Sequence, residues 1–145
     1  CVDTSGICFD GSDPRYERLL ALTNLFLLDV KHIADEAHRA LTGRSNEKPL
    51  AFARYLNAHK KPMWIRHVLV PGLTDDDGAL RELRAFLDTL ECVERVEVLP
   101  YHTMGVQKYR ALGRAYPLEG VQPPSPERVD NAKRILGAGK YAPKR

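Results

Sequence analysis

The feature that most restricts the fold of this chain is the alternation of short apolar runs with segments of helical spacing. Three runs, 25–31, 63–70 and 93–99, have the length and composition of buried strands, and Cys1–Thr4 resembles the end of a further strand. Strands that alternate with helices are typical of βα units, whose strands are parallel. We therefore expect an α/β fold with one parallel sheet.

The number of strands limits the architecture further. A closed (β/α) barrel of eight strands needs roughly 200 residues or more, whereas this chain has 145 residues with three full strands and part of a fourth. It is therefore either a small open sheet or the second half of a larger barrel. Because the chain begins at Cys1 without an initiator methionine, as if cut within a strand, we expect residues 1–145 to be part of a longer protein.

Helical spacing and capping residues predict four helices between and after the strands. They lie within 12–23, 50–61, 74–90 and 125–137, and Thr74 is expected to cap the third. The segments between them are expected to be a polar loop at 35–46 and a long irregular loop at 103–124. A loop of that length usually covers a site or binds a partner. We expect the chain to fray after Gly139.

Composition excludes several classes of function. The net charge is only +3 and the basic residues are dispersed except at 140–145, so no nucleic-acid footprint stands out. No apolar run approaches the roughly 18 residues of a membrane span. The three cysteines have no metal-ligand spacing, and their odd number argues against a disulfide framework. These features predict a cytoplasmic protein.

The apolar run at 25–31 ends in two charges that point the same way. In an extended strand side chains alternate, so Leu27, Asp29 and Lys31 share one face while Phe26 and Leu28 take the other. Parallel α/β sheets carry their chemistry at the carboxyl ends of the strands. Asp29 and Lys31 are therefore candidate site residues.

Four strand-end segments together resemble one known family. They are Cys-Val-Asp-Thr-Ser-Gly at 1–6, Leu-Asp-Val-Lys at 28–31, Trp-Ile-Arg-His-Val-Leu-Val-Pro-Gly at 64–72 and Leu-Pro-Tyr-His at 99–102. In order and spacing they are similar to segments of the pyruvate formate-lyase activating enzymes, as is Tyr-Pro-Leu-Glu-Gly-Val-Gln-Pro-Pro at 116–124. The resemblance implies the C-terminal half of a partial (β/α)6, TIM-like radical S-adenosylmethionine barrel.

The resemblance also implies an activity and partners. Enzymes of this family use a [4Fe–4S] cluster and S-adenosylmethionine to generate a 5′-deoxyadenosyl radical, which abstracts hydrogen from a glycine of pyruvate formate-lyase. The implied partners are pyruvate formate-lyase and an electron donor such as flavodoxin or ferredoxin. The implied setting is anaerobic glucose metabolism in the cytoplasm, with the enzyme a monomer.

Residue by residue, the resemblance implies two binding sites. Asp29, Val30, Lys31, Arg66 and His102 match positions at S-adenosylmethionine. A monovalent-cation site beside the cofactor is implied at Asp3, Thr4, Asp29 and the backbone carbonyl of Leu27. The residue types suit this ligand, because Lys31 and Arg66 can pair with a carboxylate while Asp29 can bind a cation or a hydroxyl.

One departure from the family restricts what the chain can do. The family holds its cluster with a Cys-x3-Cys-x2-Cys loop, and Cys1, Cys8 and Cys92 do not form that pattern. The chain also lacks the family's Gly-Gly-Glu strand, which grips the ammonium of S-adenosylmethionine. Cluster ligation needs thiolates that are presented together. We therefore expect no iron–sulfur ligand and no catalytic residue in this chain, and no activity from it alone.

Other functions remain open at this point. The partner could be a different glycyl-radical enzyme, or the half-barrel could be a binding module without catalysis. A lyase or aldolase could form a Schiff base on Lys31, although Asp29 beside it favours the charged amine. Lys108 and Tyr109 could help to dock the partner. The remaining histidines, which show no convergent spacing, are expected at the surface or behind the site: His32, His38, His59 and His67.

Overall fold

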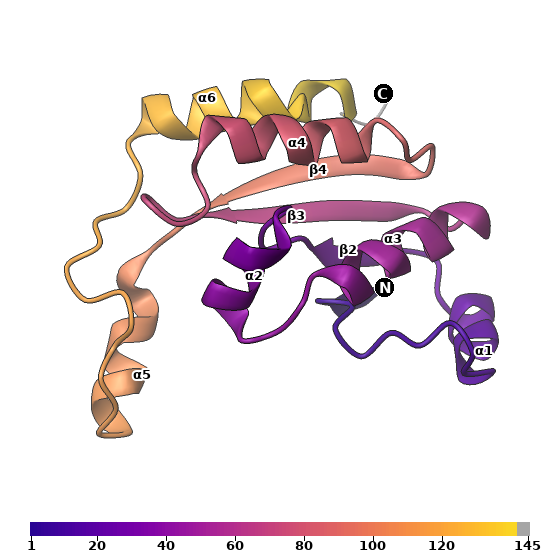
Figure 1. Cartoon of the computed structure of the whole chain (residues 1–145), viewed down its shortest axis with the longest axis horizontal. Helices are drawn as coiled ribbons and strands as arrows, with labels where there is room; N and C mark the ends of the chain where they lie inside the picture. The colour runs from indigo at the N-terminus through magenta and orange to yellow at the C-terminus, as the bar shows by residue number, and fades with distance from the viewer. Residues whose placement is uncertain (142–145) are drawn as a thin grey trace.

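A computed structural model of the protein describes residues 1–141. Its four strands form one parallel sheet in the order in which they occur in the chain (Figure 1). The strands are β1 (Val2–Thr4), β2 (Phe26–Asp29), β3 (Met63–Leu69) and β4 (Val93–Pro100). Because consecutive strands are neighbours and run parallel, each connection crosses over the same face of the sheet, as in a segment of a barrel. The predicted α/β fold is confirmed.

Within residues 1–141, six α-helices connect or follow the strands. They are α1 (Arg15–Leu22), α2 (Asp35–Thr42), α3 (Glu47–Ala58), α4 (Asp77–Leu87), α5 (Val106–Ala111) and α6 (Pro126–Leu136). Figure 1 shows α4 and α6 side by side over β4, while α5 projects from one end of the molecule. Among residues 1–141, no helix has the length and apolar character needed to cross a bilayer.

The packed face of the sheet follows from the alternation along its strands. Phe26 and Leu28 of β2, and Met63, Ile65 and Leu69 of β3, are inaccessible to solvent. They form one cluster with apolar residues of the helices, which include Phe52, Leu56, Leu80, Leu83, Leu87 and Leu136. Each large apolar side chain buried in this way stabilises the fold by about 1.5–3 kcal/mol.

The opposite face of the sheet is not covered by a helix within the described residues. Its side chains alternate with those of the packed face, and Leu27, Trp64, Arg66 and Val68 are only half-buried. We call this side of the sheet the open face. Asp29 and Lys31 lie on it, as the alternation predicted.

The helix at 125–137 has the caps that the sequence indicates. The Ser125 hydroxyl accepts a hydrogen bond from the amide of Arg128, and Gly137 ends the helix in the left-handed region with φ of 63°. For α4 the expected cap is wrong, because Asp76 accepts the hydrogen bond from Ala79. The hydroxyl of Thr74 instead donates to a carbonyl at the end of β3.

Three further expectations are corrected by the structure. Residues 35–42 form α2 rather than a loop. The segment 103–124 is not wholly irregular, because it contains a 3-10 helix at Thr103–Gly105 and then α5. Ala138–Tyr141 form a 3-10 helix where fraying was expected, and the rest of that predicted frayed end, 142–145, lies outside the described residues.

Candidate functional site

Four of the predicted site residues form one network of charges on the open face. Asp29 is its centre: its carboxylate accepts a hydrogen bond from Lys31 Nζ at 2.6 Å and another from Arg66 Nε at 2.7 Å. Arg66 also donates from Nη2 to the Asp3 carboxylate. We call Asp3, Asp29, Lys31 and Arg66 the charged cluster.

The sheet register explains why these residues meet. Asp29 and Arg66 are direct partners across β2 and β3, and Asp3 pairs with Leu27 on the far side of β2. Neighbouring parallel strands lie about 4.8 Å apart, so the long Arg66 side chain can reach past Asp29 to β1. Burial opposes the charge of Arg66, but its hydrogen bonds to Asp3 and Asp29 raise its pKa above the ordinary value.

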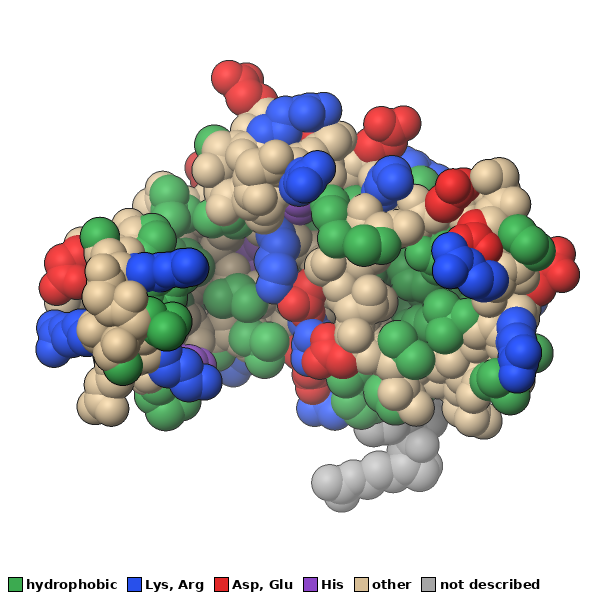
Figure 2. All heavy atoms as spheres, turned by 90° about the horizontal axis from the view of Figure 1, so that it is seen from below, with side chains coloured by type: hydrophobic (Ala, Val, Ile, Leu, Met, Phe, Trp, Pro, Cys, Tyr) green, Lys and Arg blue, Asp and Glu red, His purple; other side chains and the backbone are tan. Residues whose placement is uncertain are grey.

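The cluster is partly shielded and carries balanced charge. The side chains of Asp29 and Arg66 are 16% and 17% exposed, whereas Lys31 is 33% and Asp3 59% exposed. Figure 2 shows charged side chains gathered in the middle of the molecule as seen from below, with a hollow between them and the projecting end. Two cations and two carboxylates in contact can bind a ligand that itself carries both signs of charge.

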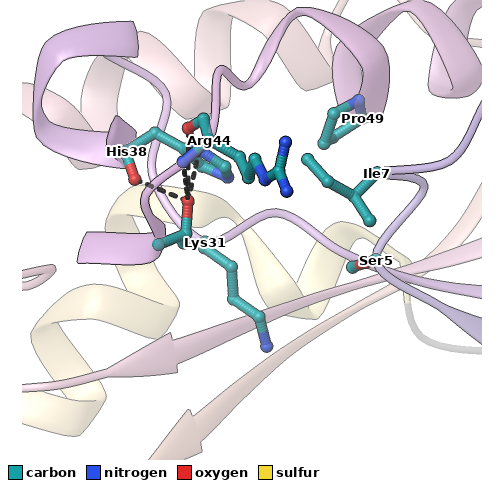
Figure 3. A pocket seen from close by; sticks show the side chains of 7 residues that line it. Ser5, Ile7, Lys31, His38, Arg44 and Pro49 are labelled. Carbon is teal, nitrogen blue, oxygen red and sulfur yellow. Dashed lines mark hydrogen bonds between the residues drawn. The ribbon is translucent and has the colours of Figure 1, made fainter. Parts of the chain in front are cut away.

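Lys31 also borders a separate hollow of about 330 Å³ (Figure 3). Figure 3 shows Arg44 extending towards Ile7 and Pro49, while the Lys31 side chain leads away from them towards the sheet. His38 is fixed in the wall because its Nδ1 lies 2.7 Å from the Arg44 carbonyl oxygen. His38 is 3% exposed, so of the two positions expected for it, at the surface or behind the site, the surface is excluded.

The backbone at Val30 is held from two sides. Its amide donates to the Arg66 carbonyl at 3.0 Å, and its carbonyl lies 2.9 Å from Nδ1 of His67. The other ring nitrogen of His67 lies 2.9 Å from the carbonyl of Thr74, so this buried ring links the end of β2 to the loop after β3. No partner of His67 could be predicted from the sequence, because both groups that its ring contacts are backbone carbonyls.

His102 is not part of the charged cluster. It lines another hollow of about 690 Å³ together with Val68 and Leu99. Val68 lies on the open face, towards the carboxyl end of β3, so His102 borders the same face as the cluster. Val96 and Val98 of β4 are buried in the packed core, whereas His102 is exposed.

The four residues expected to hold a monovalent cation are engaged in other contacts or in the sheet. Asp3 and Asp29 pair with Arg66, the Thr4 hydroxyl accepts a hydrogen bond from the amide of Gly6 at 3.0 Å, and Leu27 lies within β2. Within residues 1–141, no three acidic, histidine or cysteine side chains are grouped as metal ligands. The cation site remains a prediction.

The cysteines do not form a cluster site. Cys1 and Cys8 are exposed, whereas Cys92 is half-buried and precedes β4 at the end of the sheet opposite the charged cluster. A cubane cluster needs several thiolates in one place. The described residues therefore do not fit an iron–sulfur cluster.

Lys31 is poorly placed for covalent catalysis. Its ammonium donates to Asp29, whereas a lysine that forms a Schiff base must be a neutral amine. This contact speaks against the aldolase alternative.

Comparison with known proteins finds relatives that are named pyruvate formate-lyase-activating enzyme. The chain is 51% identical over 143 residues to the pyruvate formate-lyase-activating enzyme of Streptococcus mutans, which covers 97% of this chain and 54% of the relative. It is 46% identical to the enzymes of the same name from Listeria monocytogenes and Staphylococcus epidermidis, covering 58% and 55% of them. The chain thus spans about half the length of these curated relatives. No family model matches it.

Solved structures agree on the fold. A domain of a pyruvate-formate lyase-activating enzyme from Bacteroides vulgatus superposes with a TM-score of 0.74 at 23% identity, over 98% of this chain and 76% of that domain. A radical SAM methyltransferase from Sphaerobacter thermophilus gives 0.65 at 23% identity, over 94% of this chain and 36% of the other. The sheet of this chain therefore has the fold of part of a radical S-adenosylmethionine enzyme.

Proposed function

Because this chain belongs to the family of pyruvate formate-lyase-activating enzymes, we propose that it is the C-terminal part of such an enzyme and forms one wall of its S-adenosylmethionine site. The observation that carries the proposal is the charged cluster on the open face. Asp29 and Lys31, at the carboxyl end of β2, meet Arg66 of the neighbouring strand β3. Parallel α/β proteins bind their ligands at this end of the sheet.

The chemistry of the cluster suits the proposed ligand. S-adenosylmethionine carries a carboxylate, an ammonium, a sulfonium and a ribose, so its site needs cations and acceptors side by side. Arg66 uses Nε and Nη2 for Asp29 and Asp3, which leaves Nη1 for a ligand carboxylate. Asp3, the most exposed member, is free on its outer side to accept from an ammonium or hydroxyl.

Val30 and His102 complete the proposed wall. The buried Val30 side chain and its two backbone hydrogen bonds fix the chain between Asp29 and Lys31, which sets the direction of both side chains. His102 borders the open face beside Val68, where its ring can donate to or accept from the ribose or adenine of the ligand. A monovalent cation at Asp3, Thr4, Leu27 and Asp29 is part of the proposal and would compete with Arg66 for the two carboxylates.

We also propose the activity of the whole enzyme. When bound, S-adenosylmethionine and a reduced [4Fe–4S] cluster supply the one-electron chemistry that removes hydrogen from a glycine. The residues of this chain bind and orient the cofactor, and cysteines outside them hold the cluster. We propose pyruvate formate-lyase as the protein substrate, flavodoxin or ferredoxin as the electron donor, a monomeric state, a cytoplasmic location, and no activity from this chain alone.

Binding calorimetry tests the site without relying on turnover. In the enzyme that contains this chain, Lys31→Ala should weaken S-adenosylmethionine binding by about ten- to 150-fold, since one charge-assisted hydrogen bond is worth about 1.5–3 kcal/mol. Arg18→Ala, an exposed cation on α1, is the matched control and should bind normally. Unchanged affinity in Lys31→Ala would remove Lys31 from the site.

Electron paramagnetic resonance tests the reaction. The reconstituted enzyme with S-adenosylmethionine and a reductant should produce a glycyl radical in pyruvate formate-lyase under anaerobic conditions. A signal no larger than that of a sample without enzyme would end the proposal. A radical formed instead in another glycyl-radical enzyme would keep the cofactor site and change the partner.

A further inference from the structure

The segment 103–118 projects from the carboxyl end of β4 and has no role in the charged cluster (Figure 1). It consists of the 3-10 helix Thr103–Gly105, then α5 and the turn that follows. We call residues 103–118 the arm. An arm that projects from the site-bearing end of a sheet is placed to contact a second molecule.

The arm is tied to the sheet by tyrosines. The hydroxyls of Tyr101 and Tyr116 lie 2.8 Å apart, and this hydrogen bond raises the pKa of Tyr101 to about 12. The ring of Tyr109 meets that of Tyr116 edge to face, with 5.0 Å between the ring centroids. The base of the arm is therefore fixed, and its outer surface has a defined orientation.

The outer surface of the arm exposes large apolar side chains. Met104 is 75% exposed and Leu112 is 70% exposed, and Tyr109 is also open to solvent. Between the arm and the open face lies the hollow of about 690 Å³ that His102 borders. Aromatic residues, methionine and arginine around an apolar depression are the composition that protein interfaces favour.

The arm also carries an unbalanced charge. From Val98 to Leu118 the sequence has three basic residues, Lys108, Arg110 and Arg114, and no acidic residue. These three equal the whole net charge of +3, so acidic and basic residues balance in the rest of the chain. All three are exposed, and none forms an ion pair with another described residue.

We propose that the arm and the hollow beneath it bind an acidic segment of the protein substrate, with a large apolar side chain of that segment in the hollow. The inference rests on the proposed function, because the hollow borders His102 and therefore opens towards the proposed cofactor site. A second copy of this chain fits poorly, since two arms of the same charge repel each other. Positive charge around an apolar centre favours a partner segment that is acidic and carries an apolar side chain.

The test measures binding of pyruvate formate-lyase to the enzyme that contains this chain, by calorimetry with S-adenosylmethionine present. Lys108→Glu/Arg110→Glu should weaken binding by about tenfold or more and reduce its dependence on salt. The matched control is Arg18→Glu/Lys48→Glu, which makes the same charge change at exposed positions away from the arm and should bind as the unaltered enzyme does.

A second pair of variants tests the apolar part. Met104→Ser/Leu112→Ser should also weaken binding, whereas Leu22→Ser, at a residue 73% exposed on α1, should not. S-adenosylmethionine affinity should stay unchanged in all of these variants, because none of the altered residues belongs to the charged cluster.

The outcomes separate this inference from the proposed function. Full binding by both arm variants overturns the inference and leaves the proposed function standing. If the unaltered enzyme does not bind pyruvate formate-lyase, the proposed partner fails and the inference fails with it. Arm variants that bind the substrate protein normally but accept electrons slowly from flavodoxin also overturn it, since the arm then serves the electron donor.

Discussion

Arg66 should be coupled more strongly to Asp29 than to Asp3, although it bonds to both. The Asp29 and Arg66 side chains are both less than one-fifth exposed, whereas Asp3 is 59% exposed. A shielded hydrogen bond between charged groups is worth about 1.5–3 kcal/mol, and an exposed ion pair about 0.2–1 kcal/mol. We expect coupling energies of about 2 kcal/mol for Asp29–Arg66 and below about 1 kcal/mol for Asp3–Arg66.

Two double-mutant cycles measure these energies. Asp29→Ala, Asp3→Ala and Arg66→Ala are combined in pairs, and the free energy of unfolding is obtained from urea denaturation at low and at physiological salt. Salt should reduce the coupling to Asp3 more than the coupling to Asp29, because exposed charges are better screened. Equal couplings, or a larger one for Asp3, would refute the reasoning from burial.

Two further predictions concern stability. His67→Ala should lower the free energy of unfolding by about 1–3 kcal/mol, because the carbonyl of Val30 or Thr74 that accepts from the ring loses its buried donor. Urea denaturation checks this, and a change within error would mean that water replaces the ring. Hydrogen bonds from Ser45 and Arg39 lower the pKa of Asp35 to about 2. Its contribution is therefore present above its ordinary pKa of 3.8 and is lost as the pH falls towards 2. In Asp35→Asn the free energy of unfolding should fall less steeply as the pH drops from 3.8 towards 2. The same pH dependence as in the unaltered protein would contradict this.

The packed face of the sheet could be predicted because its signal is local. Phe26, Leu28 and Val30 alternate with Leu27 and Asp29 along the sequence. In an extended strand, such an alternation places the first three side chains on one face and the other two on the opposite face. The same alternation placed Asp29 and Lys31 on the open face. Their meeting with Arg66 could not be read from periodicity, since it depends on the register between two strands 37 residues apart.

The errors at α2 and α4 have different physical causes. The only fully buried side chain of α2 is His38, a polar residue, so the helix has no apolar stripe to detect. Its signals were the first-turn carboxylate of Asp35 and a left-handed Gly43 after its end. For α4, Thr74 and Asp76 are both good caps. The Thr74 hydroxyl donates to the half-buried carbonyl of Val68 instead, which a local pattern cannot reveal.

The histidines show the limit of reasoning from spacing. His67 lies on the packed side of β3 with Met63 and Ile65, so its burial was readable from parity. Its structural role was not readable, because a histidine whose ring contacts only backbone carbonyls leaves no motif of side chains. His102 could be placed at a strand end, but its distance from the charged cluster follows from the path of the chain after β4.

A crystal structure of the intact enzyme with S-adenosylmethionine shows whether the charged cluster binds the cofactor. We expect the ligand on the open face, over the carboxyl ends of β1 to β3. Its carboxylate should lie about 2.7–3.2 Å from a nitrogen of Lys31 or Arg66. A ligand bound elsewhere, or one that leaves Asp29, Lys31 and Arg66 without a contact, would contradict it.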